Sequence, residues 1–411
     1  MFRILKKING LPLAKTINLP LSKSISNREL ILNYLISGKI HTHEISTADD
    51  TILLIKCLNQ IKLAENSAEL TEINVDNAGT VMRFLTSVLA ISKGSFILKG
   101  NERMHQRPIS ELVDALNNLG ADIIYLDKTG FPPLKITGKD LKNNEIEIRS
   151  DISSQFISSL LLVSGFLKNG LIIHLLGKPS SEPYILMTLN LLKKCRFEYI
   201  FDNNCIHVFQ NKNPELIKSS EADWSSAAFW YEIVSFSDNL KVKLLNLKKD
   251  DIQGDKVISD IFKSFGVETI FEEDGILLFK NNLLSKEFVY DFSNCPDLAQ
   301  VVAVTAAALG IKTRLNGLES LKIKETDRLS AICTELKKLN VDIYIDNNSL
   351  IINKSEIEIN ETINTYNDHR MIMSFAPLAI LYESIEIDNI KDVSKSYPDF
   401  WVDTNDIFAI K

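Results

Sequence analysis

Charged and hydroxyl side chains are concentrated in the loops that precede predicted helices. In the first of these loops, PLSKSISNR, Lys23 and Arg28 stand among three serines just before the apolar run LILNYLI. A helix N-terminus offers free backbone N–H groups and a partial positive charge, and two added cations suit it to a phosphate or carboxylate. Taken alone, such a basic first turn is more often a solvated surface.

Further loops in the first half have the same character. The loop DNAGTVMR contains Asn77 and Gly79, and the missing side chain of Gly79 lets a ligand approach the backbone. The loop NERMHQRPI ends with Arg107 before a predicted helix, and arginine offers a planar fork to carboxylates and phosphates. Two more predicted helix starts carry hydroxyl or amide groups, namely Ser153, Ser154, Gln155, Ser180 and Ser181. Taken singly, each serine is better explained as a helix N-cap.

The second half adds carboxylates to the cations. Asp297 precedes the small-residue helix AQVVAVTAAALG, and Arg370 and Lys395 lie in DHRM and VSKSYPDFW. In KETDR, Lys324 and Arg328 are four residues apart and share a face if both are helical. Taken alone, KETDR is a salt-bridged helix start. Together, helix N-termini that converge from two domains would form a positive cleft, which predicts a small ligand with several negative charges.

The bulk composition is that of an ordinary globular protein. The chain has 411 residues, a size that favours two domains, and its formal net charge of -7 argues against a nucleic-acid partner. Five cysteines without a CxxC pair disfavour a disulfide framework or a zinc site. No signal peptide is visible at the start, and no apolar run is long enough to span a bilayer. We therefore expect a cytoplasmic protein.

A helix followed by a β-hairpin recurs along the chain. In ISELVDALNNLG, apolar residues recur at helical spacing, and two short strands follow around a Lys-Thr-Gly turn. The same pattern turns near four positions, spaced 75, 71 and 74 residues apart: Gly120, Cys195, Gly266 and Asn340. Chance similarity between common helix–hairpin units is the alternative, but the near-constant period favours real repetition.

Less regular copies follow Asp50 and Arg370, which brings the number of units to six. A boundary is expected near Glu221, where a polar stretch ends and a Ser/Ala-rich helix begins. Three α/β units would then lie on each side of this boundary.

Ten of these segments, in this order, resemble the signature of the 5-enolpyruvylshikimate-3-phosphate synthase family. They are LSKSISNR, DNAGTVMRF, RMHQRPI, SSQF, SSEPYILMT, IQGD, CPDLA, IKETDR, YNDHRM and VSKSYPDFW. The resemblance implies an α/β fold of two similar domains, each made of three repeated βαβαββ-type units with helices packed beneath mixed sheets. It places residues 21–220 in one domain and residues 1–20 with 221–411 in the other, and it implies an active site in the interdomain cleft.

The resemblance also implies a reaction. The enolpyruvyl group of phosphoenolpyruvate would pass to the 5-hydroxyl of shikimate 3-phosphate by addition and elimination, with release of phosphate, in aromatic amino-acid biosynthesis. Residues implied to bind shikimate 3-phosphate are Lys23, Ser24, Arg28, Ser153, Ser154, Gln155, Ser181, Asp297, Ser320 and Lys324. Residues implied to bind phosphoenolpyruvate are Lys23, Asn77, Gly79, Arg107, Gln155, Arg328, Arg370 and Lys395. The first domain would serve mainly shikimate 3-phosphate, and the second mainly phosphoenolpyruvate and proton transfer.

Proton transfer requires an acid and a base on opposite sides of the addition. The resemblance implies Glu325 as the proton donor and Asp297 as the base on the hydroxyl side, with Glu325 or Lys23 taking a proton back during elimination. No step needs a metal or an organic cofactor. A monomer without a nucleic-acid or membrane partner is expected.

Three positions depart from the family pattern, and two other functions compete. Ser320 stands where Asn is frequent, Phe84 where Pro is frequent, and Glu182 where Lys is common. The first alternative is the sister enolpyruvyl transferase that acts on UDP-N-acetylglucosamine, but the loop NERMHQRPI lacks the cysteine typical of that enzyme. The second is a non-catalytic anion-binding relative, which would gain nothing from Asp297 and Glu325.

Overall fold

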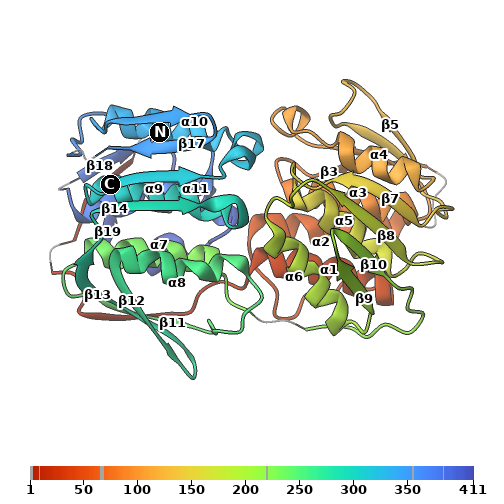
Figure 1. Cartoon of the computed structure of the whole chain (residues 1–411), viewed down its shortest axis with the longest axis horizontal. Coiled ribbons are helices and arrows are strands. Elements are labelled where there is room, and N and C mark those ends of the chain that lie inside the picture. The colour runs from red at the N-terminus through yellow and green to blue at the C-terminus, as the bar shows by residue number, and fades with distance from the viewer. Residues whose placement is uncertain (1–2, 9, 65–68, 219–220, 354–355, 383) are drawn as a thin grey trace. The chain divides into compact units, whose positions relative to one another are not determined.

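A computed structural model describes residues 3–8, 10–64, 69–218, 221–353, 356–382 and 384–411 (Figure 1). The chain divides into two compact units. The terminal unit contains Met1–Ser22, Thr47–Asp49 and Glu221–Lys411, and the inserted unit contains Lys23–Ser46 and Asp50–Ser220. The predicted division keeps 21–220 together, so the two descriptions differ at residues 21–22 and at Thr47–Asp49.

Two four-stranded sheets of one topology form the strand layer of the inserted unit. Their strand orders are β3-β4-β6-β5 and β7-β8-β10-β9, and in each the first pair is parallel and the other pairs are antiparallel. The strands are β3 (Leu70–Asn74), β4 (Ser95–Lys99), β5 (Asp122–Tyr125), β6 (Leu134–Thr137), β7 (Glu145–Arg149), β8 (Leu171–Leu176), β9 (Tyr199–Asp202) and β10 (Cys205–Val208). Alternating residues of β7 are buried, as expected for a sheet with one covered face.

The helices of the inserted unit pack around α5. They are α1 (Lys23–Ser37), α2 (Asp49–Ala64), α3 (Gly79–Ile91), α4 (Ser110–Asn118), α5 (Ser154–Ser164) and α6 (Glu182–Lys194). Helix α5 contacts α1, α3, α4 and α6, and it is buried on every side after Gln155. A helix buried all round must be apolar, and the run FISSLLLVS meets this need because its serine hydroxyls bond to nearby backbone or side-chain oxygens.

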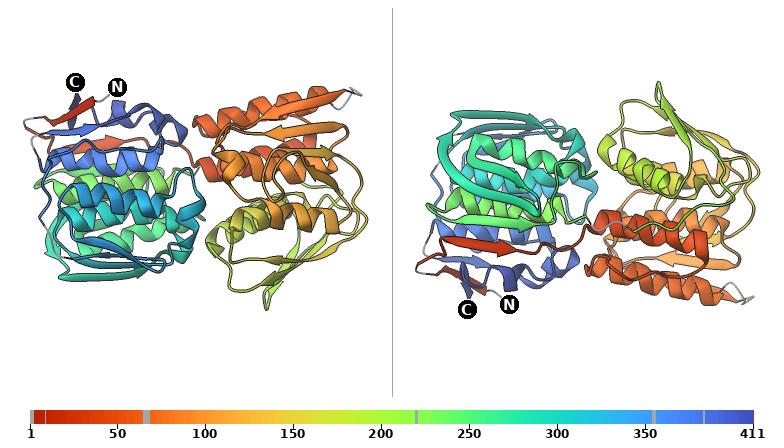
Figure 2. Two further views of the ribbon diagram at one scale, coloured as in Figure 1. Left: turned by 90° about the horizontal axis from the view of Figure 1, so that it is seen from above. Right: turned by 90° about the horizontal axis from the view of Figure 1, so that it is seen from below.

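The terminal unit repeats the same sheet topology twice. Its four-stranded sheets have the orders β2-β11-β13-β12 and β14-β15-β17-β16, again with one parallel pair each. The strands are β2 (Ala14–Ile17), β11 (Lys241–Leu245), β12 (Phe265–Glu272), β13 (Gly275–Leu284), β14 (Glu287–Asp291), β15 (Lys312–Asn316), β16 (Ile343–Asp346) and β17 (Ser349–Ile352). A third sheet places β1 (Arg3–Lys7) between β18 (Ser384–Ile387) and β19 (Phe408–Ile410) (Figure 2).

Helix α9 has the central place in the terminal unit that α5 has in the other. The helices are α7 (Trp224–Phe236), α8 (Ile258–Ile261), α9 (Ala299–Ala308), α10 (Arg328–Lys338), α11 (His369–Phe375) and α12 (Phe400–Asp403). Helix α9 contacts α7, α10 and α11 as well as β15 and β17. Its sequence AQVVAVTAAA is buried up to Ala307, and small side chains let these neighbours approach closely.

The structure confirms the α/β class and the four regular helix–hairpin repeats. The less regular copies differ: the stretch after Arg370 joins a three-stranded sheet, and among the described residues α1 and α2 have no four-stranded sheet of their own. Two predicted helices are shorter than their patterns suggest. Helix α8 is flanked by 3₁₀ turns, and α11 gives way to a 3₁₀ turn at Pro377, which lacks the N–H group that a continuing helix needs. Gly266 lies not in the turn but at a bulge in β12.

Candidate functional site

The first turn of α1 holds a cation in an ion pair. Lys23 is the first residue of the helix, and its Nζ atom lies 3.0 Å from Oδ2 of Asp50 at the start of α2. Both side chains are largely buried. The pair keeps the ammonium group at the N-terminal end of α1, where the helix dipole also favours an anion. Sequence reasoning did not select Asp50, although the acidic pair at the start of its helix is a visible signal.

Arg28 is a buried cation held by neutral oxygens. Its Nε donates to Oγ1 of Thr188 (2.8 Å), Nη2 to Oγ of Ser158 (3.1 Å) and Nη1 to the carbonyl oxygen of Ser24 (2.9 Å). Its guanidinium carbon lies 5.1 Å from the ring centre of Phe84. Among the residues that the structure describes, no carboxylate pairs with it, and burial lowers its pKa to about 10. Arg28 therefore remains charged near neutral pH and contributes positive potential to this part of the unit.

A second arginine of the inserted unit lies against the start of α3. Nη1 of Arg107 donates to the carbonyl oxygen and to Oδ1 of Asn77, at 3.3 and 3.4 Å. A Cβ atom at Gly79 would lie 2.5 Å from Nη2 of Arg107, closer than real Cβ atoms approach another atom. The glycine thus allows the guanidinium group to lie against the helix N-terminus, which brings three predicted residues together.

The predicted hydroxyl and amide residues occupy the starts of α5 and α6. Ser153 caps α5 by accepting a hydrogen bond from the backbone N–H of Gln155, while Ser154 is buried and Gln155 is half-buried. Ser181 precedes α6 in a left-handed conformation, with φ of 58°, and is buried. A non-glycine residue rarely adopts this conformation, and such residues are concentrated at functional sites. For Ser153, N-capping is an observed role.

In the terminal unit, Arg328 is the centre of a carboxylate cluster. This first residue of α10 is buried, and its Nε and Nη2 donate to the two carboxylate oxygens of Asp368 at 2.7 and 3.2 Å. Nη1 lies 3.0 Å from Oδ1 of Asp297, and Nη2 lies 2.8 Å from Oε2 of Glu325. Burial lowers the pKa of Arg328, but Asp368, Glu325 and Asp297 outweigh burial and raise it above its usual value. The arginine is thus permanently charged and fixes both predicted proton carriers.

Asp297 is surrounded by cations. Besides Arg328, its Oδ1 lies 3.2 Å from Nζ of Lys324, and its Oδ2 lies 3.3 Å from Nη2 of Arg370. Arg370 also donates to the backbone carbonyl of Asp297 at 3.2 Å. Burial raises the pKa of Asp297, but Arg370, Lys324 and Arg328 outweigh burial and hold it well below its usual range. Asp297 is therefore ionised.

Glu325 connects the last predicted cation to the cluster. Its Oε1 lies 3.9 Å from Nζ of Lys395, which is in the turn Lys391–Lys395, and both side chains are mostly buried. Six predicted residues therefore form one continuous network: Asp297, Lys324, Glu325, Arg328, Arg370 and Lys395. Ser320 is half-buried in the turn Glu319–Ile323, and the structure gives no hydrogen bond from its side chain to this network.

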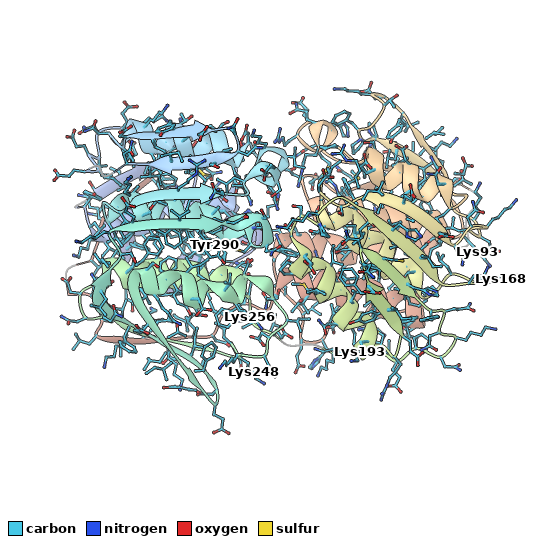
Figure 3. All side chains as sticks on the ribbon, in the orientation of Figure 1. Lys93, Lys168, Lys193, Lys248, Lys256 and Tyr290 are labelled. Atoms are coloured by element: carbon cyan, nitrogen blue, oxygen red, sulfur yellow. The ribbon has the colours of Figure 1, made fainter. Side chains whose placement is uncertain are left out.

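Two further acidic residues complete the cluster, and sequence reasoning missed both. Asp368 caps α11 by accepting a hydrogen bond from the backbone N–H of Arg370 (2.9 Å), so one carboxylate orients two arginines. Asp255 is buried and hydrogen-bonded to Ser225. Burial and the nearby Asp297 carboxylate raise its pKa, Arg370 lowers it, and the net result is a pKa of about 6. Lys256, labelled in Figure 3, fixes the preceding loop by donating to the carbonyl oxygen of Asp251 at 2.7 Å.

The described residues offer no cluster of three or more His, Cys, Asp or Glu side chains arranged to hold a metal ion. Within the same ranges, every helix is too short or too polar to cross a membrane. The groups that the site does offer are anion-binding cations, hydroxyl groups and carboxylates in ion pairs, among them Asp297 and Glu325. Such a set can bind several negative charges and can move protons.

Comparisons with known proteins place this chain in one family. The sequence model of EPSP synthase (3-phosphoshikimate 1-carboxyvinyltransferase) matches residues 8–403. A 3-phosphoshikimate 1-carboxyvinyltransferase of Bacteroides fragilis is 43% identical over 393 residues, covering 94% of each chain. One of Vibrio vulnificus is 32% identical over 423 residues, covering 97% of this chain and 96% of the relative. The solved EPSP synthase of Acinetobacter baumannii has a similar fold, with a TM-score of 0.76, 18% identity and full coverage of both chains.

Proposed function

This chain belongs to the EPSP synthase family, and we propose that it transfers the enolpyruvyl group of phosphoenolpyruvate to the 5-hydroxyl of shikimate 3-phosphate and releases phosphate. The observation that carries the proposal is the network around Arg328, in which Asp297 and Glu325 contact four cations. Cations alone would suffice to bind anionic substrates. The two carboxylates add the groups that proton transfer requires.

Phosphoenolpyruvate carries a phosphate and a carboxylate, which match the arginines of the site. We assign it to Arg328, Arg370 and Lys395 in the terminal unit, and to Lys23, Asn77, Gly79, Arg107 and Gln155 in the inserted unit. The bidentate geometry of guanidinium groups supports this assignment, because it suits planar carboxylates and phosphate oxygens. The contact of Gly79 with Arg107 adds support, since it brings a cation to the free N–H groups of α3.

Shikimate 3-phosphate adds hydroxyl groups to a phosphate and a carboxylate. We assign it to Lys23, Ser24, Arg28, Ser153, Ser154, Gln155 and Ser181 in the inserted unit, and to Asp297, Ser320 and Lys324 in the terminal unit. Helix N-termini that carry serine hydroxyls support the assignment of the phosphate. Arg28 is fully enclosed, so its part is to supply positive potential through the Ser24 and Ser158 contacts.

In the addition step, the 5-hydroxyl oxygen bonds to C2 of phosphoenolpyruvate and C3 gains a proton. Glu325 gives this proton and Asp297 accepts the hydroxyl proton. The low pKa of Asp297 makes it a weak base while it contacts three cations. Substrate anions that draw Arg370, Arg328 and Lys324 away from Asp297 would raise its pKa and strengthen the base.

In the elimination step, C3 loses a proton and the C2–O bond to phosphate breaks. Glu325, now ionised, takes this proton back, or Lys23 takes it in its neutral form. The leaving phosphate gains negative charge, which the surrounding arginines and lysines stabilise. The predicted place of this chemistry, an interdomain cleft, stays a prediction.

The test is phosphate release by the purified protein with each substrate omitted in turn. Release that requires both phosphoenolpyruvate and shikimate 3-phosphate supports the proposal. If UDP-N-acetylglucosamine replaces shikimate 3-phosphate without loss, the sister activity is the better assignment. The substitutions Asp297→Asn and Glu325→Gln separate catalysis from binding alone, because turnover that survives both at the wild-type rate contradicts the proton assignments.

We also propose that the protein acts as a cytoplasmic monomer, without a metal ion or an organic cofactor. Side chains of the site supply the charge stabilisation and the proton carriers that the reaction needs, which supports a cofactor-free mechanism. The net charge of -7 supports the absence of a nucleic-acid partner. Unchanged turnover after treatment with a chelator and a monomer mass by light scattering are the expected results.

A further inference from the structure

The loop that leads into α11 has an unusual backbone. Tyr366 and Asn367 are consecutive non-glycine residues with positive φ, 55° and 54°, immediately before Asp368. Such residues persist in this conformation only where the surrounding structure holds them. The conformation matters because the next residues are Asp368, which binds Arg328, and Arg370, which binds Asp297. A change in this loop would therefore move two arginines of the site.

A buried carboxylate outside the site holds this loop. Glu335 of α10 is fully buried, and its Oε1 accepts a hydrogen bond from the hydroxyl of Tyr366 at 2.6 Å. Its Oε2 accepts one from the backbone N–H of Asn364 at 2.9 Å and pairs with Nζ of Lys338 at 2.8 Å. Burial raises the pKa of the Tyr366 hydroxyl, and Glu335 raises it further, so the phenol remains a hydrogen-bond donor. Glu335 thus fixes the loop at two points.

The same helix holds the loop at both ends. Arg328 and Glu335 are seven residues apart in α10, which is two helical turns, so they lie on one face about 10 Å apart along the axis. Arg328 contacts Asp368 at the end of the loop, and Glu335 contacts Asn364 and Tyr366 before it. One rigid helix therefore sets the separation between these contact points.

The opposite side of the loop is held by β18 and the residue after it. The backbone of Ile363 pairs with that of Glu386 and Asp388, and the hydroxyl of Thr365 donates to Oδ1 of Asp388 at 2.7 Å. These contacts anchor the segment before Tyr366. Among the residues that the structure describes, only Glu335 forms a hydrogen bond with the hydroxyl of Tyr366, the first residue with positive φ.

We propose that Glu335 is a positioning residue for the transferase reaction. It holds the loop Asn364–Asn367 in its strained form, so that Asp368 and Arg370 meet Arg328 and Asp297. The inference rests on the proposed role of Arg370 in binding phosphoenolpyruvate. Glu335 itself has no contact with the cluster around Arg328, so its effect passes through the loop.

Steady-state kinetics of Glu335→Ala test this role. We expect the KM for phosphoenolpyruvate to rise about 10- to 100-fold, because two hydrogen bonds to a charged acceptor are lost, while the KM for shikimate 3-phosphate changes about twofold or less. Glu335→Gln should restore most of the affinity, since an amide can still accept from the Asn364 N–H and donate to the Tyr366 oxygen. Tyr366→Phe should give an intermediate effect. An unchanged KM for phosphoenolpyruvate in folded Glu335→Ala overturns the proposal.

Two control variants on the same helix separate positioning from stability. Thr334 is exposed and adjacent to Glu335, so Thr334→Ala should match the wild type. Leu336 is fully buried, so Leu336→Ala should lower the melting temperature without a selective rise in the KM for phosphoenolpyruvate. If Leu336→Ala and Glu335→Ala have the same melting temperature and raise the KM for phosphoenolpyruvate equally, Glu335 has a structural role only.

Hydrogen exchange distinguishes failure of this inference from failure of the proposed function. In protein without substrates, Glu335→Ala should speed exchange at the amides of Asn364 and Arg370 at least tenfold, whereas exchange in β4 stays unchanged. Wild-type protein that releases no phosphate would refute the transferase while leaving this exchange result interpretable. Normal phosphate release together with unchanged exchange would refute the positioning role alone.

Discussion

Two arginines, one in each unit, are equally buried but have opposite surroundings. Arg28 of α1 contacts two hydroxyls and a carbonyl, and burial lowers its pKa to about 10. Arg328 of α10 contacts three carboxylates, which raise its pKa despite the same burial. Burial alone therefore does not decide what a buried cation does. The charge of Arg328 is balanced by carboxylates inside the protein, and Arg328 fixes their positions. Arg28 instead brings a positive charge that the described carboxylates do not neutralise.

The largest effect is expected from Arg328→Met. This change leaves Asp368 buried without its cation and removes one partner each from Asp297 and Glu325. Loss of one partner from a buried ion pair costs about 3–5 kcal/mol, so chemical denaturation should show a loss of that size, and kcat/KM should fall more than about 1,000-fold. A loss below about 1 kcal/mol would show that the carboxylates do not depend on this arginine.

Asp297→Asn should reduce turnover while preserving the fold. The amide keeps the shape of the side chain but cannot act as a base, so we expect kcat to fall about 100- to 10,000-fold. Arg328 keeps Glu325 and Asp368, and Arg370 keeps its hydrogen bond to the backbone carbonyl of residue 297, so the melting temperature should change little. Single-turnover rates measure the chemical step directly, and a normal rate would remove Asp297 from the mechanism.

Arg28→Met is the matched test in the inserted unit. Thr188 and Ser158 keep hydrogen bonds to each other and to the Tyr184 carbonyl, so the free energy of unfolding should change by about 1 kcal/mol or less. The KM for shikimate 3-phosphate should nevertheless rise about 10- to 100-fold. A loss of stability as large as that in Arg328→Met would end the contrast between the two arginines.

Gly79→Ala should weaken phosphoenolpyruvate binding by displacing Arg107. The new Cβ atom would lie 2.5 Å from Nη2, so the guanidinium group must move and weaken its bonds to Asn77. We expect about a tenfold rise in the KM for phosphoenolpyruvate. In the Arg107→Ala background the same change should add almost nothing, and an additive effect would show that Gly79 acts independently.

A further prediction concerns the pH dependence of stability. The pKa of Asp255 is raised from 3.8 to about 6, so the folded protein binds this proton more tightly than the unfolded chain does. Its contribution to stability is therefore present at low pH and lost as pH rises from about 4 to 6, at no more than about 1.4 kcal/mol per pH unit. Asp255→Asn should remove this pH dependence from the free energy of unfolding, measured by urea denaturation at several pH values across that range. If the pH dependence of the free energy of unfolding persists in Asp255→Asn, another titrating group causes it.

Much of the fold could be predicted because single residues in the sequence mark several of its turns. Gly120 and Asn340 adopt positive φ at two of the four predicted turning points, whereas Gly266 adopts it at a bulge in β12. At the fourth, Arg196 rather than Cys195 has this conformation, and no glycine marks it. The cations at helix starts could also be predicted, because each charged residue lies in the same short segment as the start of the helix that positions it.

The partners of these cations could not be predicted in the same way. Asp368 and Glu335 meet Arg328 and Tyr366 through contacts between separate elements, 40 and 31 residues apart. Local spacing carries no signal of such pairs, and a lone carboxylate beside a helix looks like a solvated side chain. The burial of Arg28 could not be predicted either, because the residues that cover it belong to α5 and α6, more than 120 residues further along the chain.

The early strands of the terminal unit pair with strands that are made only after the inserted unit. Ala14 of β2 pairs with Lys241 of β11, and β1 lies between β18 and β19 near the end of the chain. During synthesis, the residues of the inserted unit are complete at Ser220, while β1 waits for Ile410. At about 5–20 residues per second, this wait lasts roughly 20–80 seconds. Strand β1 thus emerges from the ribosome long before its partners and stays open to wrong pairing until they follow.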